Sequence, residues 1–161
     1  MKEKELLKRA LCAYLPWKLK LKSINDGSIN TMVGIGPTVV DLKGCVTTFP
    51  IELFKPIFRP WSSLTEYQND LGLTPLIHLA EMYLPIEREL GEFYTANGYV
   101  MTYGGITFGY NHEDGFYLSD PSYHGLINQL KMFEKLIEWH YNAYNLPENL
   151  VIYREQSLIK E

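Results

Sequence analysis

The hydrophobic residues nearest the N-terminus recur with the period of an α-helix. Leu7, Leu11 and Tyr14 share one face of residues 3–15, and acidic residues lie near the start of this segment. The spacing predicts an amphipathic helix. Pro16 marks its end, because proline cannot continue the backbone hydrogen bonding of a helix.

After this helix the pattern changes to a period of two. Leu19 and Leu21 alternate with Lys18, Lys20 and Lys22. This alternation predicts a half-buried strand whose lysines line the outer face and protect a sheet edge. Turn residues then separate further short apolar runs, and these predict a β-meander with strands at 29–35, 38–42 and 45–49.

An apolar run cut by Pro56 and Pro60 follows the meander. Because proline lacks a backbone donor, the run predicts an edge strand or an extended crossing segment and excludes a central strand. We expect Phe54 and Phe58 to dock onto the domain and to hold the segment there. A short helix that begins near Ser62 is expected to follow.

The second half of the chain mixes helices with another set of short strands. Thr74 and Pro75 carry the residue types of an N-cap and a first helical position, and they predict a helix at 75–83. A second helical piece is expected from Pro85 through Phe93. The remaining pattern predicts strands at 99–103, 106–110 and 116–118 and a long helix at about 125–144.

These elements predict an α+β fold. We expect antiparallel strands from two hairpin sets to form a sheet that packs against three main helices. The length of 161 residues fits one globular domain at 1–161, and the chain shows no internal repeat or linker.

The long helix is predicted to be apolar on two sides. Its wider stripe is interpreted as the core face, and it comprises Leu126, Leu130, Phe133, Ile137, Tyr141 and Tyr144. The second strip comprises Met132, Leu136, Trp139 and Ala143. A helix with two apolar sides is either sandwiched in the core or exposes a partner surface, so the second strip is a candidate protein-binding site, in a homodimer or with another protein.

Composition narrows the class of partner. The chain is 46% hydrophobic and 14% aromatic, which is typical of a globular protein with a large core, and its formal net charge is −4. Lysine and arginine are spread out, so the basic footprint of a nucleic-acid-binding protein is missing. The N-terminus lacks a signal-peptide pattern, and no apolar stretch approaches the ~18 residues that a bilayer span needs. We therefore expect a cytoplasmic protein that contacts neither membrane nor nucleic acid.

No motif assigns a reaction. The glycine-containing run at 34–38 lacks the ending of a phosphate loop, and the polar turn at 111–115 lacks the ligand spacing of a metal site. We predict no cofactor and no metal, and the catalytic residues stay unknown. A small enzyme whose site is assembled only in the fold is one alternative, with His78, His112, His124 or His140 as its base.

The two cysteines, Cys12 and Cys45, fall in a predicted helix and a predicted strand. Cysteine is often a small buried hydrophobe, and neither residue has a metal-ligand neighbour at a recognised spacing. We therefore expect two reduced thiols in the core.

Three short motifs lie in the early, middle and late parts of the chain: Leu15-Pro16-Trp17-Lys18-Leu19-Lys20, Phe54-Lys55-Pro56-Ile57-Phe58-Arg59-Pro60-Trp61-Ser62-Ser63-Leu64-Thr65 and Leu136-Ile137-Glu138-Trp139-His140-Tyr141. In this order they resemble a family of small uncharacterised proteins that are common in prophages and mobile elements of gut anaerobes. Typical members of that family carry Tyr-Gly in place of Trp17-Lys18, Leu and Asp in place of Trp61 and Ser63, and Tyr in place of Ile137. The resemblance implies a phage-associated setting in a bacterial host and no mechanism.

These observations together favour an accessory protein that acts without catalysis by binding an unknown host or phage protein. The aromatic content and the second apolar strip motivate this hypothesis. An inhibitor of a host defence complex is an alternative from the same setting, although the net charge is small for a nucleic-acid mimic.

Overall fold

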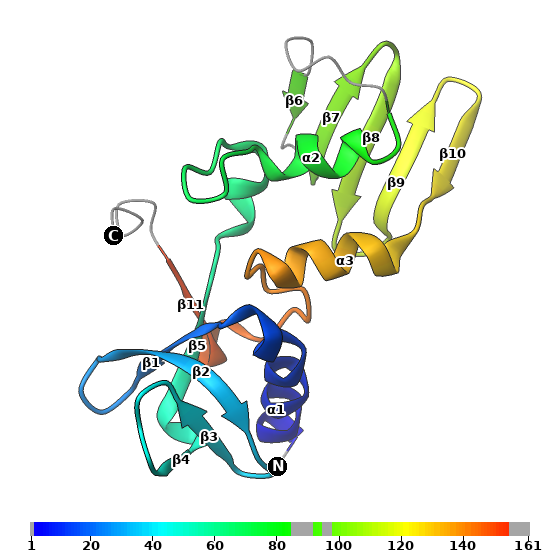
Figure 1. Ribbon diagram of the computed structural model, residues 1–161. Coiled ribbons are helices and arrows are strands. Elements are labelled where there is room, and N and C mark those ends of the chain that lie inside the picture. The colour runs from blue at the N-terminus through cyan, green and yellow to red at the C-terminus, as the bar shows by residue number, and fades with distance from the viewer. Residues whose placement is uncertain (1, 85–91, 95–97, 155–161) are drawn as a thin grey trace. The chain divides into compact units, whose positions relative to one another are not determined.

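A computed structural model of the chain describes residues 2–84, 92–94 and 98–154 (Figure 1). The chain divides into two compact units. Unit 1 is drawn from Met1–Pro60 and Lys135–Glu161, and unit 2 from Trp61–Glu134. Helices and sheets occur together, so the predicted α+β class is confirmed. The predicted single domain at 1–161 stays a prediction, and each unit is described by itself.

Unit 1 consists of one helix and a mixed six-stranded sheet in the order β11-β5-β1-β2-β3-β4. Neighbouring strands are antiparallel except β11, which is parallel to β5. The elements are α1 (Lys2–Tyr14), β1 (Lys20–Ser23), β2 (Ile29–Ile35), β3 (Val39–Leu42), β4 (Thr48–Pro50), β5 (Phe54–Phe58) and β11 (Ile152–Tyr153), with short 3₁₀ helices at Leu15–Trp17, Ile51–Leu53 and Glu148–Leu150. The predicted first helix and meander are therefore present, except that the strand predicted at 45–49 begins only at Thr48.

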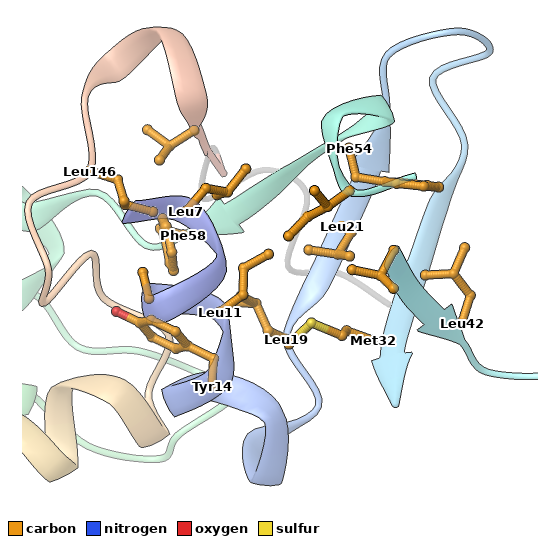
Figure 2. Packing of buried hydrophobic residues seen from close by; sticks show 14 residues of the cluster. Leu7, Leu11, Tyr14, Leu19, Leu21, Met32, Leu42, Phe54, Phe58 and Leu146 are labelled. Atoms are coloured by element: carbon orange, nitrogen blue, oxygen red, sulfur yellow. The ribbon is translucent and has the colours of Figure 1, made fainter. Parts of the chain in front are cut away.

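The core of unit 1 lies between α1 and one face of this sheet. Leu7, Leu11 and Tyr14 of α1 point toward side chains from the strands, as Figure 2 shows. The strand residues of this cluster are Leu19, Leu21, Met32, Val40, Leu42, Phe54 and Phe58. Side chains alternate between the two faces of a strand, and α1 covers only one face of this sheet. The residues of β1 and β2 that alternate with the buried ones therefore point to the other face.

Two predictions about sheet edges are wrong. β1 lies between β5 and β2, so its lysines do not protect an edge. β5 is also interior, although it contains Pro56. The N–H of Ile24 donates to the carbonyl of Leu53 at 2.8 Å, which makes the facing pair Leu21–Pro56 a non-hydrogen-bonded one. The nitrogen of Pro56 therefore points away from β1, toward the side where the pairing with β11 begins only at Ile57.

Unit 2 consists of an antiparallel five-stranded sheet with two helices, in the strand order β10-β9-β8-β7-β6. The elements are a 3₁₀ helix at Trp61–Thr65, α2 (Pro75–Glu81), β6 (Glu92–Tyr94), β7 (Tyr99–Tyr103), β8 (Ile106–Asn111), β9 (Gly115–Asp120), β10 (Tyr123–Leu126) and α3 (Gln129–Glu138). The boundary between the units falls within α3, after Glu134. The two hairpin sets thus form two sheets, whereas the sequence predicted one.

Aromatic rings fill the core of unit 2. The rings of Tyr110 and Phe116 lie 4.6 Å apart, and Phe133 of α3 meets Phe116 edge-on at 5.7 Å. The amide of Gln129 joins the start of α3 to β9, because its Nε2 donates to the carbonyl of Phe116 at 2.6 Å and its Oε1 accepts the N–H of the same residue at 2.7 Å.

The last helix is shorter than predicted at both ends. Residues 123–126 form β10, and the side-chain oxygen of Asn128 accepts the N–H of Lys131, which is the pattern of an N-cap. At the other end the N–H of Tyr141 donates to Leu136 at 2.8 Å and that of His140 to Ile137 at 3.0 Å. His140 has φ +63°, so the helix ends in a Schellman motif with histidine where glycine is usual.

The predicted helix from Pro85 lies mostly outside the described residues. Where the description resumes, Phe93 belongs to β6 and pairs with Met101 of β7. Strand pairing therefore replaces the helical conformation that the sequence predicted at Phe93. The helix before this segment is confirmed, since α2 begins at the predicted Pro75.

Candidate protein-binding face

The second apolar strip of the last helix is buried. Met132 and Leu136 have no exposed surface, Trp139 is 5% exposed, and Ala143 is half-buried. By contrast, Leu126 and Leu130 of the stripe interpreted as the core face are 60% and 71% exposed. Leu126 lies in β10, before α3 begins, whereas Phe133 of the same stripe packs in the aromatic core of unit 2 and Tyr141, beyond the end of α3, is fully buried. The long helical stripe therefore does not exist, and only some of its residues are exposed. The burial of the second strip therefore favours its interpretation as core over its interpretation as an exposed partner surface.

His112 belongs to an aromatic cluster in unit 2. Its ring meets Trp61 edge-on at 4.8 Å, and its Nδ1 shares a hydrogen bond of 3.1 Å with the hydroxyl of Tyr110. Trp61 in turn stacks on Tyr110 at 5.2 Å. Burial raises the pKa of Tyr110 to about 12, so this hydroxyl stays protonated at neutral pH. The contacts of His112 thus provide packing and a hydrogen bond but no activated nucleophile.

His78 lies beside a carboxylate on the surface of unit 2. With Glu81, Tyr67 and Thr74 it lines a depression of about 190 Å³. Pockets that hold small-molecule ligands usually measure roughly 300–1,000 Å³ and enclose most of the ligand. A deep pocket with a histidine and a carboxylate would favour an enzyme, but this depression is small and open.

The other two histidines have structural contacts. His124 is exposed, and its ring lies 5.1 Å from that of Tyr117 on the neighbouring strand. In unit 1 the Nε2–H of His140 donates to the carbonyl of Trp17 at 2.7 Å, and the carbonyl of His140 accepts the N–H of Arg59 at 2.8 Å. Within unit 2, His78, His112 and His124 therefore have different neighbours.

Both cysteines are free and exposed, so their predicted place in the core is wrong. Cys12 follows Leu11 on α1, and one step along a helix turns the side chain by roughly 100° away from the buried face. Cys45 lies in the segment between β3 and β4 and is not part of a strand. Among the residues that the structure describes, no group of histidine, cysteine and carboxylate side chains could hold a metal ion.

The outer face of the unit 1 sheet carries lysines on neighbouring strands. Lys20 and Lys22 flank Leu21, which is fully buried, so both lysines leave β1 on the face opposite the core. Lys55 lies between two buried residues of β5, and it is the direct cross-strand partner of Lys22. Three amines therefore share one surface, and the alternation in the sequence predicted two of them there.

Apolar side chains of β2 lie among these lysines. Ile29 pairs with Lys22 and is 58% exposed, and Val33 is 51% exposed. Between them Thr31 pairs with Lys20, and its Oγ1 accepts a hydrogen bond of 2.6 Å from the Lys20 Nζ. We call this surface the lysine face, and it consists of Lys20, Lys22, Ile29, Thr31, Val33 and Lys55.

Few carboxylates accompany the lysine face. Asp41 on β3 is exposed at its border, and Lys43 follows β3, where its backbone N–H donates to the carbonyl of Thr31 at 2.9 Å. Within the described chain, no ion pair includes Lys20, Lys22 or Lys55. The face is therefore locally basic although the whole chain carries a formal charge of −4.

Sequence reasoning alone did not find this face as a site. The lysines of β1 were visible as an alternating pattern, but Lys55 is distant in the sequence and joins them only through the β1–β5 pairing. Ile29 and Val33 belong to a strand whose register with β1 decides which face they share. The alternating lysines were the available signal, and only the pairing showed that they form a cluster.

None of the helices in the described part of the chain is long and apolar enough to cross a membrane. Comparisons with protein-family models, with curated proteins and with solved structures gave no match. The resemblance to proteins of prophages and mobile elements stays a prediction.

Proposed function

We propose that the protein acts by binding another protein, without catalysis, through the lysine face. The observation that carries this proposal is the mixture of lysines, which form no ion pair with the residues that the structure describes, with exposed Ile29 and Val33 on one sheet face. Interfaces between proteins combine apolar contacts with complementary charge. The partner that fits has an acidic surface with some apolar side chains.

A protein partner fits this face better than a nucleic acid. The lysine face has no arginine and no aromatic ring, whereas single-stranded nucleic acid is commonly held by stacked aromatic side chains. A chain with net charge −4 also repels a polyanion at long range. Exposed isoleucine and valine side chains, in contrast, gain from contact with apolar groups of a protein.

The setting that we propose is the cytoplasm of a bacterium that carries a prophage or mobile element. The support for this setting is the resemblance carried by residues 15–20, 54–65 and 136–141. In that setting the partner is a host protein or another phage protein. A second copy of the chain is a less suitable partner for the same face, because a two-fold contact would bring like charges together.

Affinity capture with matched charge variants tests the proposal. The bait is wild type, Lys22→Glu/Lys55→Glu, or the control Lys2→Glu/Lys131→Glu, which changes the formal charge by the same amount at exposed helix positions. Captured proteins from the bacterium that encodes the chain are quantified by mass spectrometry, and thermal melts verify that each bait is folded.

We expect at least one protein to be retained by wild type and by the control and to be lost by the lysine-face variant. The same set of captured proteins with all three baits would show that the lysine face is not where a partner binds. Loss from both charge variants would indicate a general charge effect and would also contradict the proposal.

A further inference from the structure

Lys22 and Lys55 face each other directly across β1 and β5. Residues that are paired in this way have Cβ atoms about 4.5–5.5 Å apart, and like charges at such positions destabilise a sheet. Lys20 adds a third positive charge on the same face of β1. The sheet therefore carries an arrangement that local stability disfavours.

Two nearby carboxylates have other partners, and Asp41 lies at the border of the face. Glu52 forms an ion pair of 2.9 Å with Lys4, and this hydrogen bond lowers the pKa of Glu52. Asp26 accepts the N–H and the hydroxyl of Ser28 at 2.9 and 2.7 Å, and these bonds lower the pKa of Asp26. Both groups are thus ionised at neutral pH but occupied, and the lysine face keeps its positive charge.

Lys20 differs from the other two lysines of this face. Its Nζ donates to the Oγ1 of Thr31, which places this amine over β2. Lys22 and Lys55 make no hydrogen bond through their amines to any other residue of the described chain. The side chain of Lys22 extends toward Gly27 in the turn between β1 and β2. Each of the two ammonium groups carries three N–H donors, which is the donor type that a carboxylate accepts.

We propose that Lys22 and Lys55 together bind a carboxylate side chain of the protein partner. This inference rests on the proposed function and assigns the anchor point of that binding site. A carboxylate between the two amines removes their mutual repulsion and forms charge-assisted hydrogen bonds. Ile29, the partner of Lys22 on its other side, offers an apolar contact for a neighbouring side chain of the same partner. The like-charge pair lowers the stability of the free chain, and in the complex it binds the carboxylate of the partner.

The occupant is an acidic protein segment with apolar neighbours, for the reasons that favour protein over nucleic acid at this face. Free phosphate would satisfy the amines but would leave Ile29 and Val33 exposed to solvent. An acidic protein segment and free phosphate therefore differ in whether they contact the apolar side chains of β2. A glutamate peptide that contains leucine should contact both the lysines and Ile29, whereas inorganic phosphate should affect the lysines alone.

Nuclear magnetic resonance titration of the full chain tests the assignment with defined probes. The probes are a short peptide of glutamate and leucine, the same peptide with glutamine in place of glutamate, inorganic phosphate, and a short DNA duplex. Amide signals of Lys22, Lys55 and Ile29 report on the face, and that of Lys131, in unit 2, serves as a reference. Each titration is repeated with Lys22→Gln/Lys55→Gln and with the control Lys2→Gln/Lys131→Gln.

We expect the glutamate peptide to shift the signals of all three face residues and to bind roughly tenfold more weakly to Lys22→Gln/Lys55→Gln, with no change in the control. Equal binding of the glutamine peptide, equal affinity for the lysine-face variant, or no binding of the glutamate peptide would each overturn the assignment. Tighter binding of the duplex or of phosphate than of the glutamate peptide would also overturn it.

The two proposals fail in different ways. If capture of a partner is lost with Lys22→Glu/Lys55→Glu while the glutamate peptide does not bind, the protein-binding function stands and the carboxylate anchor is wrong. If all baits capture the same proteins, the function proposed for this face is wrong whatever the peptide does.

Discussion

The hydroxyl of Tyr14 donates a hydrogen bond of 2.5 Å to the backbone carbonyl of Tyr141, a residue 127 positions later in the chain. The same hydroxyl accepts the N–H of Ala143 at 3.0 Å. Tyr14 is completely buried, and burial raises its pKa well above the ordinary value for tyrosine. One phenol from α1 thus bonds to two backbone groups of the segment that follows α3, which also bond to each other at 2.8 Å, and it joins this segment to α1 within unit 1.

We expect Tyr14→Phe to lower the free energy of unfolding by about 0.5–1.5 kcal/mol, because it removes the hydrogen bonds of the phenol while the carbonyl of Tyr141 keeps the N–H of Ala143, which donates to it at 2.8 Å. The ring and its packing against Phe58 at 5.1 Å are kept, so the change isolates the hydroxyl. Urea unfolding measures the difference. Tyr67→Phe is the matched control. Tyr67 is 62% exposed, so the loss of its hydroxyl should change the free energy of unfolding little. Equal stability of Tyr14→Phe and wild type would show that the two hydrogen bonds contribute nothing.

The end of α3 gives a second prediction. His140 has φ +63°, a conformation that costs a non-glycine residue roughly 1 kcal/mol, and its imidazole donates to the carbonyl of Trp17. His140→Ala loses the hydrogen bond and keeps the strain, whereas His140→Gly loses the bond and relieves the strain. We therefore expect the alanine variant to be the less stable of the two by about 1 kcal/mol in thermal or chemical unfolding. A glycine variant no more stable than the alanine variant would contradict a strained position.

Local patterns in the sequence predicted most of unit 1 and part of unit 2. The period of two in β1, the Asp26-Gly27 turn and the run of β2 are all local signals, and the structure has these strands where they were expected. The helix start at Pro75 is equally local. Elements with a strong period or a distinctive turn residue could thus be placed without knowing the fold.

The features that failed depend on pairing between distant segments. Pro56 argued against an interior strand, but its nitrogen points to the side of β5 where β11 covers only the last residues, and this could not be known before the register. The end of α3 at His140 lacked the glycine that usually signals a Schellman motif. The lysine face could not be predicted from the sequence for the same reason, because Lys55 lies opposite Lys22 only through strand pairing.

Trp139 tests whether the strip of α3 is core. The side chain is 5% exposed, and its ring lies 5.9 Å from the Lys135 amine. We expect Trp139→Ala to lower the free energy of unfolding by roughly 3–5 kcal/mol, as the loss of a buried tryptophan does. Leu130→Ala, at a residue that is 71% exposed on the same helix, should change it by less than about 0.5 kcal/mol. A Trp139→Ala protein with wild-type stability and altered self-association in sedimentation would favour an interface instead.

The raised pKa of Tyr110 predicts that the protein loses stability at high pH. Burial raises its pKa to about 12 from the ordinary value of 10.0, so the folded protein binds a proton that the unfolded chain releases between these values. The contribution of this group is complete below pH 10 and declines as the pH rises toward 12. We expect the free energy of unfolding of Tyr110→Phe to fall less steeply across this range than that of wild type. If the free energies of unfolding of the two proteins change in parallel with pH, Tyr110 has the same pKa in the folded and the unfolded state, and the prediction is wrong.

The repulsion at the lysine face makes a prediction for the free protein. Lys22 lies opposite Lys55, and replacing it by glutamate converts a like-charge pair into an attractive one. We expect Lys22→Glu to raise the free energy of unfolding by about 0.2–1 kcal/mol at low ionic strength, with Lys22→Gln between it and wild type. Added salt should reduce these differences, because it screens exposed charges.

Urea unfolding at low and high salt measures both effects. A Lys22→Glu protein less stable than wild type at low salt would mean that the lysines do not repel each other, and the physical reason for a carboxylate between them would be lost. If the variant is more stable, the same substitution that improves the free protein should weaken its binding to an acidic partner. A gain in stability that accompanies a loss of binding is the expected sign of a surface kept for function at a cost to the fold.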